Sequence, residues 1–125
     1  MSISNSFLDY VVEQLVELGD VKAKKMFGGA ALYFDGLIFA LIAEDILYFK
    51  VDNSNRKDYI QKGRGPFKPF DDRPMVMPYY EVPADVLENR KQLAEWARKS
   101  LTVSINTNIQ AKGTKGKKQP FNFVR

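Results

Sequence analysis

The sequence predicts an α+β domain in which helices pack on an antiparallel β-meander. Residues 4–18 and 84–109 repeat apolar side chains at the spacing of one helix face, whereas residues 30–51 hold three β-rich runs joined by two-residue turns. Strands joined by such short turns must be antiparallel, because a parallel crossover needs about a dozen residues or more. A chain of 125 residues is also the ordinary size of one domain.

The first helix is expected over residues 4–18. Ser4 or Ser6 can cap its N-terminus, and Gly19 is a natural residue to end it. One face of this helix is apolar and is formed by Phe7, Leu8, Val11, Val12, Leu15 and Leu18.

Four strands are expected next, and short turn sequences separate them. Asp35-Gly36 between apolar runs is a strong hairpin signal, because glycine accepts the positive φ of a type I′ turn. Glu44-Asp45 joins the following pair. Gly28-Gly29 precedes a strand rather than a helix, so we expect a bend there and not a phosphate-binding loop. The strands are expected at residues 22–27, 30–34, 37–43 and 46–51.

The second half of the chain predicts a short helix over residues 53–63, a further strand over residues 75–82 and a long final helix. Pro78 cannot donate a hydrogen bond to a neighbouring strand, so its strand is expected at a sheet edge or with a bulge. The final helix begins after Pro83 and is expected to reach about Ile109. Its apolar stripe, expected to pack on the sheet, includes Leu87, Leu93, Trp96, Ala97 and Leu101.

Strand 37–43 is apolar at every position. Both faces of the sheet are therefore expected to be covered, either by helices on each side or by a second copy of the protein. Residues 1–110 hold 14 basic and 15 acidic residues, and this nearly neutral charge does not oppose self-association. We predict a homodimer whose contact face includes Leu37, Ile38, Phe39 and Ile42.

The net charge of +4 belongs to the C-terminal end of the chain. Residues 111–125 hold five basic residues and no acidic one, and they are expected to form a disordered tail after a domain of residues 1–110. Such a tail either neutralises DNA phosphates without reading their sequence or only aids solubility. The candidate DNA contacts are Lys112, Lys115, Lys117, Lys118 and Arg125.

Catalysis is the least favoured class of function. The chain has no Cys and no His, which excludes a thiolate nucleophile, an imidazole base and a His/Cys zinc site. The adjacent acids Glu44-Asp45 and Asp71-Asp72 fall in turns, where they are expected to be solvated. We therefore predict no catalytic residue, no cofactor and no metal, although an enzyme built on Asp, Glu, Lys, Tyr or Ser stays open.

The sequence also predicts a cytoplasmic protein. Its longest apolar run, residues 37–43, is far shorter than the roughly 20 residues that span a bilayer. The N-terminus lacks the basic region and apolar stretch of a signal peptide.

Short motifs follow one another along residues 5–101: Met26-Phe27-Gly28-Gly29, Leu32-Tyr33 before Asp35-Gly36, Phe39-Ala40-Leu41-Ile42-Ala43, Leu47-Tyr48-Phe49-Lys50-Val51, Pro66-Phe67, Met77-Pro78-Tyr79-Tyr80-Glu81-Val82-Pro83 and Leu93-Ala94-Glu95-Trp96-Ala97. In this order they resemble the N-terminal domain of the TfoX/Sxy family. The resemblance implies a compact α+β fold similar to secretion-chaperone-like folds, and no established catalytic residues.

TfoX/Sxy proteins are known as bacterial regulators of DNA-uptake competence that act beside a cyclic-AMP-responsive transcription factor. Their full-length chains continue into a second domain, whereas this sequence has the basic residues 111–125 in that place. We therefore expect a stand-alone, non-enzymatic regulatory module that binds a transcription-regulatory protein or itself. DNA binding through the tail is the alternative.

Overall fold

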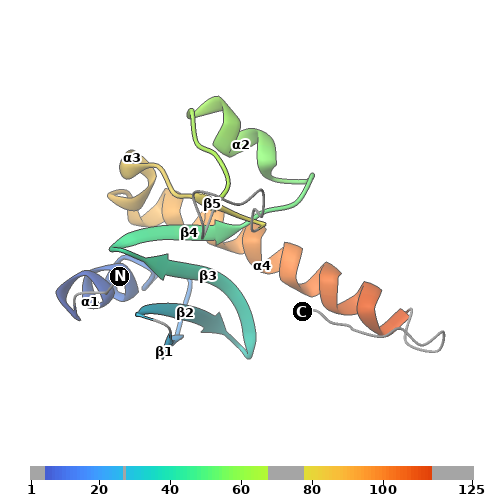
Figure 1. The fold of residues 1–125 in the computed structure, drawn as a ribbon, viewed down its shortest axis with the longest axis horizontal. Coiled ribbons are helices and arrows are strands. Elements are labelled where there is room, and N and C mark those ends of the chain that lie inside the picture. The colour runs from blue at the N-terminus through green and yellow to red at the C-terminus, as the bar shows by residue number, and fades with distance from the viewer. Residues whose placement is uncertain (1–4, 27, 68–77, 114–125) are drawn as a thin grey trace.

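The computed structural model describes residues 5–26, 28–67 and 78–113, with the side chains of residues 108–113 left out. These residues form an antiparallel sheet of five strands in the order β1-β2-β3-β4-β5, together with helices (Figure 1). The α+β class and the meander predicted from the sequence are confirmed. The elements are α1 (Asn5–Gln14), β1 (Val21–Met26), β2 (Gly29–Phe34), β3 (Leu37–Ala43), β4 (Ile46–Lys50), α2 (Arg56–Gln61), β5 (Tyr79–Glu81), α3 (Ala84–Leu87) and α4 (Arg90–Gly113).

Two-residue turns join β2 to β3 and β3 to β4. Asp35 and Gly36 have φ values of 56° and 81°, and Glu44 and Asp45 have φ values of 54° and 59°. Positive φ at both central residues is the geometry of a type I′ turn, whose twist matches that of the strands it joins. At Glu44-Asp45 no glycine supplies this geometry, so the hairpin itself must hold two side-chain-bearing residues in the left-handed region.

A β-bulge interrupts the pairing of β2 with β3. Leu32 lies opposite Ala40, but Tyr33 lies opposite Ile38, so Phe39 is an extra residue in β3. As a result, Phe39 and Ala40 both face the core and both have no exposed surface. Side chains along β3 therefore do not alternate strictly between the two faces of the sheet.

The helices cover one face of the sheet. α4 packs across β3 and β4 through Leu93, Ala97 and Leu101, and α1 lies over the β1 side, where its Asn5 accepts a hydrogen bond from Lys25 of β1 (2.6 Å). Trp96 of α4 is only 8% exposed, as predicted. Its ring meets the ring of Tyr59 from α2 edge to face, at 4.7 Å between centroids.

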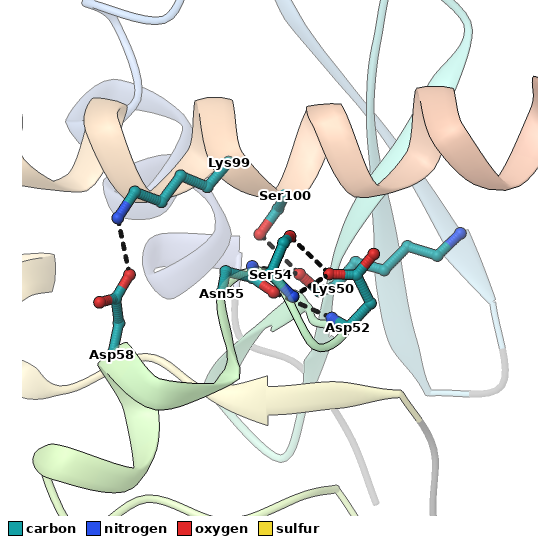
Figure 2. Close-up of polar contacts among 7 residues, drawn as sticks. All are labelled: Lys50, Asp52, Ser54, Asn55, Asp58, Lys99 and Ser100. Carbon is teal, nitrogen blue, oxygen red and sulfur yellow. Dashed lines mark hydrogen bonds and ion pairs between the residues drawn. The ribbon is translucent and has the colours of Figure 1, made fainter.

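Buried hydrogen bonds attach the segment after β4 to α4 (Figure 2). The carbonyl oxygen of Lys50 accepts one bond from the Ser100 hydroxyl of α4 (2.8 Å) and one from the Asn55 side chain (3.1 Å). The Asn55 side-chain oxygen in turn accepts from the backbone N–H of Asp52 (2.9 Å), so the turn before α2 is closed internally. Asp58 of α2 then pairs with Lys99 of α4 at 2.8 Å.

The C-terminal half of the fold differs from the prediction in two ways. The expected final helix is broken into α3 and α4, because the Asn89 side chain accepts the backbone N–H of Gln92 (3.0 Å) and starts a new helix. α4 continues to Gly113, so residues 111–113, expected in the tail, are helical. β5 is an edge strand, as predicted, and begins after Pro78, while residues 75–77 lie outside the described residues.

Replacement of Gly29 by alanine should destabilise the fold. A Cβ at this position would overlap the carbonyl oxygen of Ile42 on the neighbouring strand, which is backbone and cannot rotate away. We expect a loss of about 1–3 kcal/mol in the free energy of unfolding, measured by urea denaturation. Gly65→Ala is the control, because a Cβ there would meet no atom within 4 Å and should change stability by less than about 0.5 kcal/mol. Equal denaturation midpoints for both variants would contradict this close approach.

Candidate functional site

The face of the sheet that points away from α1, α2 and α4, here called the outer face, carries a continuous set of apolar and aromatic side chains. Strand register and the β3 bulge determine which side chains lie on it, since residues paired across neighbouring strands share a face. Tyr33 pairs with Ile38, Leu41 pairs with both Ala31 and Tyr48, and Ala43 pairs with Ile46. The outer face therefore contains Ala31, Tyr33, Ile38, Leu41, Ala43, Ile46, Tyr48 and Tyr79, together with the charged Glu81 and Lys50, which pair with Tyr48 and Tyr79.

Most of these side chains are only partly buried. Tyr33, Leu41 and Tyr48 have intermediate exposure, whereas Ala31 has none and Tyr79 is 5% exposed. Phe67 extends the aromatic surface beyond β4, because its ring lies 4.6 Å from that of Tyr48. The middle of the outer face is thus apolar, with tyrosine rings from three strands.

Charged residues lie at the two margins of the outer face. Lys22 and Lys24 of β1 are exposed and pair with Tyr33 and Ala31, so they share this face. At the opposite margin, Arg64 lies 3.6 Å from Glu81 of β5. An apolar, aromatic centre with a polar rim is the composition of a protein–protein contact surface.

Tyr48 and Tyr79 of the outer face keep their protons at neutral pH. Burial raises the pKa of Tyr79 to about 12, and the neighbouring Tyr33 adds to this shift. Burial also raises the pKa of Tyr48, with a further increase from the carboxylates of Glu81 and Glu44. These hydroxyls therefore offer apolar ring surface and neutral hydrogen-bonding groups, and no charged phenolate.

The structure divides the self-association face predicted from the sequence. Phe39 and Ile42 are 0% and 2% exposed in the core, and Leu37 also packs against it, so these three side chains face the helices. Of the four predicted residues, Ile38 lies on the outer face. The predicted face does not include Tyr33, Leu41 or Tyr48, because the position of the bulge decides which side chains of β3 face outward.

Several other candidates lie in turns or outside the described residues. Lys115, Lys117, Lys118 and Arg125 are not described, and neither are Asp71-Asp72 or the side chain of Lys112. Glu44-Asp45 is exposed at a hairpin turn. Gly28 and Gly29 lead into strand β2, as the bend interpretation predicted.

Within the described parts of the chain, no three Asp or Glu residues gather where a metal ion would bind. Over the same residues, no helix is both long enough and apolar enough to cross a membrane.

Fold and surface together define a small α+β domain with one face of its sheet left free of described helices. Residues 13–104 match the family model of the TfoX N-terminal domain. The chain belongs to this family, as its ordered motifs indicated. Among curated proteins, none matches the chain at a significant level.

Stability should fall when the pH rises above about 10, and Tyr79 should contribute to this loss. An unfolded tyrosine ionises near pH 10, whereas Tyr79 in the folded chain ionises near pH 12, so its stabilising contribution is complete below pH 10 and is lost between these values. When the pH rises from about 8 to about 11, the free energy of unfolding should fall by roughly 1 kcal/mol less in Tyr79→Phe than in the wild type. Urea unfolding at both pH values measures this difference.

Tyr10→Phe is the matched control for this experiment. Tyr10 lies on α1 and is 39% exposed, so this variant also removes one tyrosine hydroxyl but leaves the buried Tyr79 in place. An identical loss of stability in wild type and Tyr79→Phe would contradict the assigned burial of the Tyr79 hydroxyl.

Proposed function

We propose that this chain is a non-enzymatic regulatory module that acts by binding protein partners through the outer face of its sheet. The observation that carries the proposal is the partly exposed centre of this face, formed by Tyr33, Leu41 and Tyr48. Membership of the TfoX N-terminal domain family supports a role in transcriptional regulation of the kind known for competence regulators.

The chemistry of the outer face favours contact over catalysis. The centre of this face, formed by Tyr33, Leu41 and Tyr48, contains no Asp, Glu, Lys or Arg side chain to transfer a proton, and burial raises the pKa of the Tyr48 hydroxyl. Tyrosine is, in contrast, enriched among the residues that contribute most to protein–protein binding, since one ring supplies much contact area at a small entropic cost. An apolar patch bordered by Lys22, Lys24 and Glu81 is typical of such a surface.

A second copy of the chain is one candidate occupant of the outer face. Residues 1–110 are almost neutral overall, so two copies do not repel one another strongly. A homodimer built on this face would bury Leu41 and Tyr48 rather than Phe39 and Ile42, which are already in the core.

Leu41→Lys should abolish partner binding without unfolding the domain. The lysine would place a charge in the centre of the outer face, where a partner has to exclude water, while its stem can still reach solvent. Wild type and variant would be used as bait in nuclease-treated cell lysate, and sedimentation at micromolar concentration would compare each mass with the monomer mass of 14.3 kDa.

Val16→Lys is the matched control, because Val16 is 57% exposed in the turn that follows α1, away from the outer face. Partner capture or dimer formation that survives in Val16→Lys and disappears in Leu41→Lys supports the proposal. Equal binding by the two variants would place the interaction elsewhere.

DNA binding through the C-terminal residues is the second candidate function, and the observation that favours it is the charge distribution. The final 15 residues hold five basic side chains, whereas the rest of the chain has a net charge of −1. If all five contact phosphates, log affinity should fall with log salt at a slope of about −4 to −5, and the base sequence should not matter.

Deletion of residues 111–125 should therefore abolish DNA binding and leave the core intact, because the described core residues end at Ser104. Fluorescence anisotropy of a labelled duplex at two salt concentrations compares the full and shortened chains. Undiminished binding by the shortened chain would show that DNA binds to residues of the domain, such as Lys62 and Arg64.

A further inference from the structure

The two edge strands of the sheet, β1 and β5, differ in whether other residues lie beside them. Along β5, residues 65–67 run beside the strand: Pro66 bridges to Tyr80, and the Phe67 N–H donates to the carbonyl of Tyr79 at 2.7 Å. Along β1, the recorded backbone partner is β2, and no other described residue pairs with the strand's outer edge. β1 is six residues long, so alternate N–H and C=O groups over about 20 Å are available to an added strand.

We propose that the free edge of β1 binds an extended acidic segment of a partner protein, which joins the sheet as an additional strand. The proposal rests on the proposed function, since it concerns a partner of the same protein-binding module. Backbone hydrogen bonds to β1 would supply affinity, and the side chains of β1 would select the segment.

The charges of β1 argue for an acidic segment. Lys22, Lys24 and Lys25 are all exposed, and the strand contains no acidic residue. Lys22 and Lys24 lie on the outer face and Lys25 on the helix face, so an added strand meets positive charge on both faces.

The recorded contacts leave most of this charge uncompensated. Lys25 contacts the neutral side chain of Asn5, and Lys22 is 3.1 Å from Asp20 with both side chains more than two-thirds exposed. Such an exposed ion pair is weak and can be exchanged for a carboxylate of the partner.

The same lysines argue against a second copy at this edge. Antiparallel pairing of two β1 strands about Ala23 places Lys22 of one opposite Lys24 of the other, because both lie on the outer face, and like charges opposite each other destabilise a pair of strands. Lysines on an edge strand protect against self-pairing in this way. An acidic strand is attracted by the same lysines. The lysines of β1 therefore disfavour a second copy of the chain and favour an acidic segment.

The residues near the start of β1 indicate how the bound segment is oriented along the strand. A hollow of about 460 Å³ lies there, lined by Phe34 together with Gly19, Asp20, Lys22, Asp35 and Gly36. The phenyl ring suits an apolar side chain and the two carboxylates at this end disfavour an acidic one, whereas the lysines at positions 24 and 25 suit acidic side chains. The segment therefore places an apolar residue at the Val21 end of β1 and acidic residues towards Met26.

A labelled synthetic peptide of about eight residues that alternates Val and Glu tests the proposal by fluorescence anisotropy with the full chain. We expect binding that weakens with salt, no binding of the matching Val/Lys peptide, and loss of about five- to tenfold in affinity with Lys24→Glu. Lys57→Glu, at an exposed lysine of α2, is the control and should bind as the wild type does.

A third peptide carries the same side chains but has N-methyl groups at alternate backbone nitrogens. Strand addition requires that this peptide fails to bind, because it keeps the charges and loses the hydrogen bonds. Equal binding of the methylated peptide, equal affinity of Lys24→Glu and Lys57→Glu, or no binding of the Val/Glu peptide to the wild type would each overturn the proposal.

The outcome is separable from that of the proposed function. Leu41→Lys leaves β1 unchanged and should bind the Val/Glu peptide normally. Peptide binding without any partner capture from lysate would support strand addition at β1 and refute partner binding through the outer face. Partner capture without peptide binding would support the outer face and refute strand addition at β1.

Discussion

The extra residue in β3 decides how the sheet meets the helices. It directs both Phe39 and Ala40 into the core, where the Phe39 ring lies 5.8 Å from that of Phe49. With strict alternation, Leu37 would point to the opposite face from Ile42; with the bulge, both face the helices. The strong bend that a bulge imposes on its strand is visible in the curvature of β3 in Figure 1. The bulge thus determines both which side chains of β3 lie in the core and which lie on the outer face.

Buried polar groups then fix where the helices sit on the curved sheet. Gln14 of α1, only 7% exposed, donates to the carbonyl of Leu87 at 2.9 Å and accepts from Arg90 at 3.0 Å, which ties α1 to the junction of α3 and α4. Ser100 and Asn55 do the same for α4 and the turn before α2 through the carbonyl of Lys50 (Figure 2). Because a buried polar group without its partner is costly, these bonds specify one helix arrangement where apolar contacts alone would permit several.

The sequence predicts the features that depend on local chemistry. Asp35-Gly36 places the first hairpin, Pro78 places its strand at an edge, and the spacing around Trp96 places that ring in the core. The bulge at Phe39 was not predictable in this way, because β3 is apolar in either register and both alternatives bury hydrophobic surface. The candidate surface depends on that register, so only the structure shows that Tyr33, Tyr48 and Tyr79 lie together on one face.

The outer face and the edge of β1 are parts of one surface. Lys22 pairs with Tyr33, and Lys24 pairs with Ala31, so the charged edge borders directly on the apolar centre. A strand added along β1 would place its alternate side chains on the outer face, next to Tyr33, and widen that face by about 4.8 Å. The lysines would then control the approach and orientation of an acidic partner, since exposed charges act over distance, whereas the apolar centre would contribute mainly to how long the partner stays bound. Such a surface would divide two tasks between two groups of residues, because the lysines of β1 would select the segment that joins the sheet, whereas Leu41 would hold a partner that also covers the outer face.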